Sequence, residues 1–144
     1  MKKLLFPLFA LVLVALASSC NSDSCSFTGK WRVKSADIQS EKLSATILNM
    51  AKDELMSTQY EFTKDGKISM TVGESGVGNS GTYQFDSDTQ TLTFDTKNSM
   101  NMESHLTSTV TACSQLEITL TERQPDDPAK EAIATTIYTL ERIQ

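Results

Sequence analysis

Residues 59–72 read Gln-Tyr-Glu-Phe-Thr-Lys-Asp-Gly-Lys-Ile-Ser-Met-Thr-Val, and they carry the clearest structural signal in the chain. Apolar and polar side chains alternate on both sides of Asp65-Gly66, a dipeptide that favours a tight two-stranded turn. Alternation with a period of two is typical of a strand with one buried and one solvated face. The stretch therefore predicts an antiparallel hairpin with an inward face made of Tyr60, Phe62, Ile68, Met70 and Val72.

The same alternation recurs along the rest of the chain. Six further runs show it, at residues 30–35, 82–85, 91–95, 106–113, 116–121 and 138–143. Residues 41–56 differ, because their apolar side chains recur at helical spacing behind Ser40, a favourable N-cap. The sequence therefore predicts an all-β protein, an eight-stranded antiparallel up-and-down barrel with one helix inserted between strands one and two. A two-sheet sandwich would show the same alternation and is the second choice.

The predicted connections differ in length between the two ends of the barrel. Those that follow even-numbered strands are short, whereas those that follow odd-numbered strands cover residues 36–58, 73–78, 96–101 and 123–134. Binding sites usually lie on loops held by a rigid scaffold, so the end with the long loops is the expected functional end. The alternative is that long loops are merely tolerated on that rim.

Residues 1–19 have the pattern of an export signal. Lys2 and Lys3 precede an apolar run that is too short to span a bilayer, which favours a signal peptide over a membrane helix. The small residues before Cys20 resemble a bacterial lipobox, which implies cleavage there and a lipid anchor on Cys20. The alternative is ordinary signal cleavage nearby, with Cys20 as a thiol. Asn21 resembles an outer-membrane sorting signal, so we expect an outer-membrane lipoprotein, on the periplasmic face or the cell surface.

The sequence divides the chain into three parts. Residues 1–19 are the predicted lipoprotein signal peptide, residues 20–26 a tether, and residues 27–144 the barrel. If Cys20 carries lipid, Cys25 and Cys113 remain as a candidate disulfide in an oxidising compartment. Both are expected at the end with the short loops, with Cys113 on the outward face of its strand. Two reduced thiols are the alternative.

Gly29 and Trp31 open the first strand, and Arg142 faces inward from the last. This pattern resembles lipocalins and their calycin relatives, in which a Gly-x-Trp tryptophan closes the barrel and a late arginine packs over it. The resemblance covers residues 27–144 and implies that Gly29, Trp31 and Arg142 close one end. With the lipobox, the chain is similar to lipocalin-like lipoproteins of uncharacterised function. The helix after the final strand of lipocalins has no counterpart here, and the predicted helix after strand one is similar to the lid of fatty-acid-binding proteins.

Composition excludes several classes of function. Two of the 13 Lys and Arg residues lie in the first 19, which leaves 11 basic and 18 acidic residues and a formal charge of −7. This balance argues against nucleic acid as a partner and against membrane contact other than through the N-terminal lipid. The one histidine, His105, faces outward as a solvated surface residue. Asp126 and Asp127, flanked by prolines, are interpreted as a solvated turn; the alternative is a weak cation site that they form with Glu122 near the open rim. We expect no metal and no cofactor. We also expect no enzyme activity, because nothing supplies a nucleophile with its base and no predicted inward strand position is acidic.

The predicted interior suits a small apolar or amphiphilic ligand. Methionine adapts to irregular apolar shapes, and the expected ligand-binding residues are Tyr60, Phe62, Met70, Tyr83, Phe85, Met100, Met102, Leu106 and Tyr138. The alternative is a barrel filled by its own side chains, which would act on an envelope protein, as an inhibitor or a complex subunit, through its open-end loops. The sequence leaves both open.

Overall fold

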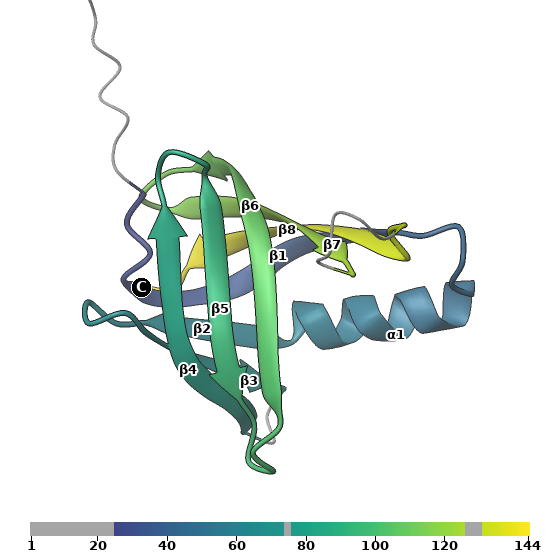
Figure 1. Cartoon of the computed structure of the whole chain (residues 1–144), viewed down its shortest axis with the longest axis horizontal. Coiled ribbons are helices and arrows are strands. Elements are labelled where there is room, and N and C mark those ends of the chain that lie inside the picture. Colours follow the sequence, from purple (N-terminus) through teal and green to yellow (C-terminus); the bar gives the residue numbers. More distant parts are fainter. Residues whose placement is uncertain (1–24, 74–75, 126–130) are drawn as a thin grey trace, which may run out of the picture.

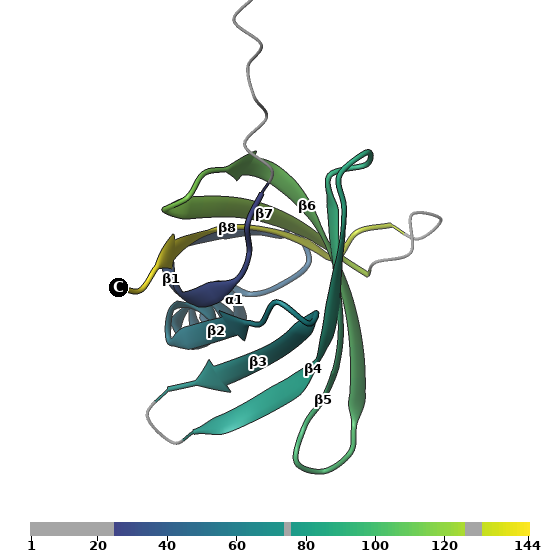
Figure 2. The same cartoon turned by 90° about the vertical axis from the view of Figure 1, so that its left-hand side faces the viewer.

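The structure, a computed structural model, describes residues 25–73, 76–125 and 131–144. Eight antiparallel strands form a closed barrel in chain order, each paired with the next and β8 with β1 (Figures 1 and 2). One helix lies between the first two strands, so the predicted barrel and its inserted helix are confirmed and the sandwich is excluded. The elements are β1 (Gly29–Gln39), α1 (Ala45–Met56), β2 (Thr58–Phe62), β3 (Lys67–Val72), β4 (Val77–Asp86), β5 (Thr91–Lys97), β6 (Glu103–Cys113), β7 (Glu117–Gln124) and β8 (Ala134–Arg142).

The helix begins later than the sequence predicts. Ser44 is its N-cap and accepts a hydrogen bond from the Ile47 amide, so α1 starts at Ala45 and not at Glu41. Ser40 instead closes a turn, because its hydroxyl accepts the Lys42 and Leu43 amides. No side chain of α1 is fully buried, and Leu55 alone among its residues packs against the barrel core. Within the described residues, no helix is both long and apolar enough to cross a membrane.

Two β-bulges change which side chains face inward. In β1 the pairing with β8 shifts between Val33 and Ser35, so Ala36 is buried and Ser35, predicted to face inward, is exposed. In β6 the pairing with β7 shifts between Val110 and Ala112. A bulge adds one residue to one strand and so reverses the alternation beyond it. In β1 and β6, a strict alternation of inward and outward residues therefore gives the wrong orientation beyond the bulge.

The loop predicted at residues 73–78 is shorter in the structure. β4 starts at Val77, so only residues 73–76 connect it to β3. Strand propensity is low for glycine, yet two glycines here allow neighbouring backbones to approach closely. A Cβ on Gly78 would lie 2.4 Å from the Met70 carbonyl oxygen, and one on Gly81 would lie 1.9 Å from that of Asp95. The turn between β5 and β6 is also short, so the open end has two long connections, residues 40–57 and 125–133.

We expect Gly81→Ala to lower the free energy of unfolding by about 3 kcal/mol, because the new methyl group cannot be placed without moving β5 away from β4. Urea denaturation of the variant checks this. The matched control is Ser80→Ala, which changes the exposed neighbouring side chain on the same strand. Equal stability of the two variants would contradict the close approach.

The barrel is tight at one end and divided at the other. β1 pairs with β2 only over Gly29–Arg32, and its second half pairs with β8 alone. The β6–β7 pairing begins at Ser108 and Glu122, so the first five residues of β6 pair with β5 alone. Figure 1 shows the result: β1, β7 and β8 run toward one side with α1, while β4, β5 and β6 point away from them. The open end therefore has two seams, by which we mean places where neighbouring strands stop pairing. One lies between β1 and β2, beside α1, and the other lies between β6 and β7.

Candidate functional site

Trp31 closes the tight end of the barrel. Its side chain is completely buried, and its indole Nε1 donates to the Phe27 carbonyl oxygen at 2.6 Å. The Arg142 guanidinium carbon lies 4.3 Å from the centre of the Trp31 ring, which is cation–π geometry. Arg142 also donates to three carbonyl oxygens, those of Ser26, Thr28 and Gln115. Gly29 is required beside this contact, because a Cβ there would lie 2.5 Å from Arg142 Nη1.

A disulfide joins Cys25 to Cys113 at the same end, with the two Cα atoms 5.8 Å apart. The predicted bridge is therefore present, and it indicates an extracytoplasmic protein. The predicted outward orientation of Cys113 is wrong. Because of the bulge in β6, Cys113 pairs with the buried Ile118 and packs partly against the core.

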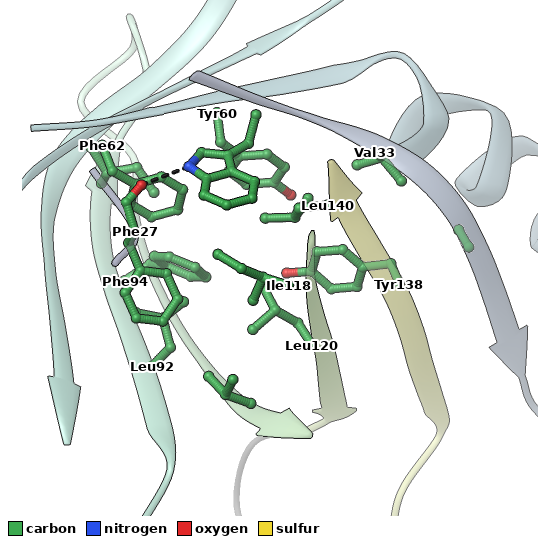
Figure 3. Packing of buried hydrophobic residues seen from close by; sticks show 14 residues of the cluster. Phe27, Val33, Tyr60, Phe62, Leu92, Phe94, Ile118, Leu120, Tyr138 and Leu140 are labelled. Atoms are coloured by element: carbon green, nitrogen blue, oxygen red, sulfur yellow. Dashed lines mark hydrogen bonds between the residues drawn. The ribbon is translucent and has the colours of Figure 1, made fainter. Parts of the chain in front are cut away.

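Aromatic side chains fill the tight half of the barrel (Figure 3). Tyr60, Phe62 and Tyr138 are at most 4% exposed. Tyr60 stacks on Phe62 and on Tyr138, at centroid distances of 6.2 and 6.5 Å. Tyr83 meets the edge of Phe62 at 5.0 Å, and its hydroxyl donates to the Thr63 carbonyl oxygen. These predicted ligand-binding residues therefore form core, together with Phe85, which packs on Phe27.

The predicted methionine lining is only partly present. Met70 and Leu106 are half-buried and pack against the core, as expected for residues that line an interior. Met100 and Met102 do not, because they lie at the β5–β6 turn and are 72% and 57% exposed. Leu116, predicted to face inward, is also exposed at the β6–β7 turn. All three residues lie in turns, Met100 and Met102 between β5 and β6 and Leu116 directly before β7.

The sequence places Glu122 near the open rim, but its inward orientation was not predicted. β7 was predicted to end at Thr121, but it continues to Gln124, which places Glu122 on the same face as Ile118 and Leu120. Glu122 Oε1 accepts hydrogen bonds from Ser108 Oγ at 2.9 Å and from the Tyr138 hydroxyl at 2.5 Å. Extending the alternation of β7 by one step would have found this residue, because its parity is already inward.

Two buried tyrosines, Tyr138 and Tyr60, feel the charge of Glu122. Burial is the main cause that raises the pKa of Tyr138 well above its usual value, and the neighbouring Tyr60 and Glu122 raise it further. Burial also raises the pKa of Tyr60, with the charge of Glu122 as the second cause. Ionising either phenol would place a second negative charge in a site of low dielectric constant. Both phenols therefore stay protonated at neutral pH, and the Tyr138 hydroxyl donates to Glu122.

A pocket of about 350 Å³ opens where β6 and β7 stop pairing. Its walls combine apolar, charged and polar side chains, namely His105, Leu106, Thr107, Glu122, Arg123, Gln124, Pro125 and Ile133. The pocket therefore joins one of the predicted lining residues, Leu106, to the Glu122 carboxylate. Such a mixture suits a molecule with an apolar part and a polar group.

The two basic side chains at this pocket, His105 and Arg123, have partners of their own. His105 Nδ1 lies 2.6 Å from Asp95 Oδ1, and both side chains are exposed, as the outward parity of His105 predicts. Arg123 Nη1 donates to the Pro125 carbonyl oxygen at 3.4 Å. Among the described residues, no three potential metal ligands lie together.

Some predicted features lie outside the described residues. They are the signal peptide, the Cys20 anchor and the Asp126-Asp127 turn. No protein family model and no curated protein sequence matches the chain. The closed eight-stranded antiparallel barrel is consistent with a lipocalin-like fold.

Proposed function

We propose that this chain is an envelope-anchored, lipocalin-like lipoprotein that binds a small amphiphilic ligand at the open end of its barrel. The observation that carries the proposal is the pocket between β6 and β7, which places Leu106 and Ile133 beside the Glu122 carboxylate. The aromatic side chains fill the tight half of the barrel, so the ligand lies at the seam rather than deep inside. It binds without covalent chemistry, cofactor or metal.

The anchoring part of the proposal rests on the N-terminal sequence. Residues 1–19 have the signal pattern, Cys20 follows the lipobox-like residues, and the disulfide fits an oxidising compartment. Asn21 favours the outer membrane as the destination. The formal charge of −7 beyond the signal peptide supports contact with the membrane through the lipid alone and gives no basis for nucleic-acid binding.

Native mass spectrometry tests the ligand-binding proposal. The chain from Ser22 to Gln144 contains every described residue and can be purified from a lipid-containing host. We expect a bound mass that is lost on denaturation. Leu106→Trp should remove that mass by filling the pocket, whereas Leu116→Trp, at an exposed position of the opposite end, should keep it. A folded protein with no bound mass, or a mass retained by Leu106→Trp, would contradict the proposal.

A second candidate function is engagement of an envelope protein. It is favoured by α1, which leaves Ile47 51% and Met50 67% exposed on a helix that buries none of its side chains. This function requires a partner that is lost on Met50→Glu and retained on Asn49→Glu, a change at an already polar, exposed position of the same helix. Crosslinking in the native envelope followed by identification of the linked protein tests it.

A further inference from the structure

We infer that the tight end of the barrel holds a second binding site, for a small aromatic molecule, which the chain's own Phe27 occupies until the Cys25–Cys113 disulfide is reduced. The segment involved is residues 25–28, which we call the N-terminal strap; it precedes β1 and belongs to no strand. The inference goes beyond the proposed function, because this site lies at the opposite end from the pocket between β6 and β7. Each site can therefore exist without the other.

The Phe27 side chain fills a space lined by aromatic rings of the barrel. Its ring centroid lies 4.9 Å from that of Phe85, 5.9 Å from that of Phe62 and 6.2 Å from that of Tyr83, and each pair is tilted. Aromatic pairs prefer such distances and angles. Phe27 is buried although it comes from outside the sheet. The strap thus places one ring where three rings of β2 and β4 would accept another of similar size.

Noncovalent contacts hold the strap to the barrel through its carbonyl oxygens. Trp31 Nε1 donates to that of Phe27 (Figure 3). Arg142 donates to those of Ser26 and Thr28, at 3.0 and 2.6 Å. Each bond contributes little net stability, because the same carbonyl groups bind water when the strap is released. Burial of the Phe27 ring adds to them, but ordering the strap costs backbone entropy of similar size. The noncovalent contacts are therefore nearly balanced by this cost.

The disulfide decides this balance. Cys25 begins the strap, and its bond to Cys113 fixes the strap to the end of β6. With the bridge intact, residues 26–28 form a short loop closed at both ends, so little further entropy is lost when Phe27 docks. Both cysteines are half-buried, so neither is sealed in the core. A dithiol reductant breaks the S–S bond, leaves a thiol on each cysteine and itself becomes a disulfide. The strap is then released and the aromatic site opens.

Toluene is the probe for this site, because it has the ring and the single carbon substituent of the Phe27 side chain. We compare NMR titrations of the chain from Ser22 to Gln144 before and after reduction with dithiothreitol. The reduced form should bind toluene at least about tenfold more tightly, since a site that is blocked in nine molecules of ten loses tenfold in apparent affinity. The Trp31 indole signal should move on reduction, because its hydrogen bond to the strap is lost. The amide signals of β5 should show that the barrel stays folded.

Two variants separate the occupant from the bridge. Phe27→Ala should bind toluene with the disulfide intact, because the ring that fills the site is gone. Ser26→Ala, at an exposed position of the same strap, should bind it no better than the unaltered chain. If Phe27→Ala does not fold, the reduced chain decides alone, because it keeps every side chain.

Three results would overturn the inference. They are a folded reduced chain that binds toluene no better than the oxidised one, a reduced chain that unfolds as a whole, and a folded Phe27→Ala that does not bind toluene. None of them bears on the pocket between β6 and β7, which the Leu106→Trp variant tests separately.

Discussion

Trp31→Ala is expected to lower the free energy of unfolding by about 4 kcal/mol, the usual cost of removing a large buried aromatic side chain. The indole is completely buried, donates to the Phe27 carbonyl oxygen and carries the Arg142 guanidinium over its ring. Its loss would leave a cavity at the tight end and a cation above an empty space. Urea denaturation followed by circular dichroism measures the change.

Trp31→Phe is the matched control. It keeps an aromatic ring under Arg142 and loses the indole hydrogen bond, so we expect about half the cost of the alanine variant. If Trp31→Ala lowered the free energy of unfolding no more than Trp31→Phe, Trp31 would not be the residue that closes this end of the barrel.

Loss of the disulfide is the second large effect. Cys25→Ser should lower the free energy of unfolding by about 4–5 kcal/mol. The bridge joins residues 88 positions apart and so reduces the conformational entropy of the unfolded chain. Denaturation of this variant, with and without a reducing agent, measures the change.

A reducing agent should lower the stability of the unaltered chain and leave that of Cys25→Ser unchanged. The double variant Cys25→Ser with Cys113→Ser should be no less stable than the single one, because one bridge accounts for both residues. Additive losses would show that the cysteines act independently and would contradict the bridge.

The barrel was predictable because every strand contains a run of residues in which apolar and polar side chains alternate, even where a bulge interrupts it. Tyr60, Phe62 and Tyr138 face inward as predicted, and the hairpin at Asp65-Gly66 forms between β2 and β3. Alternating apolar and polar side chains predict which face of a strand is buried, and this prediction holds where the strand has no bulge. The contact of Arg142 with Trp31 was likewise expected, from the inward parity of both residues and the family resemblance.

Local irregularities account for the errors. Bulges in β1 and β6 carry no sequence signal of their own, so the orientations of Ser35 and Cys113 were wrong. The glycines of β4 favour a loop in the sequence, because glycine has a low strand propensity. In the structure they leave room for the backbone of a neighbouring strand. Met100 and Met102 were assigned to the interior on hydrophobicity alone, but both lie at a turn.

The candidate site was harder to predict than the fold. Glu122 became part of it because β7 runs three residues beyond Thr121, where tertiary pairing with β8 extends the strand. The pocket itself depends on where the β6–β7 pairing stops, at Ser108 and Glu122. No local pattern encodes that point, since both strands continue past it with other partners.

An amide NMR titration with dodecanol, a neutral amphiphile, tests the central claim most directly. The account predicts that shift changes cluster at Leu106, Glu122, Arg123 and Ile133, on the walls of the pocket between β6 and β7. The indole signal of Trp31, at the opposite end, should stay in place. Shift changes centred on the tight end or on α1, or a spectrum that does not change, would contradict the claim that the divided end of this barrel is its binding site.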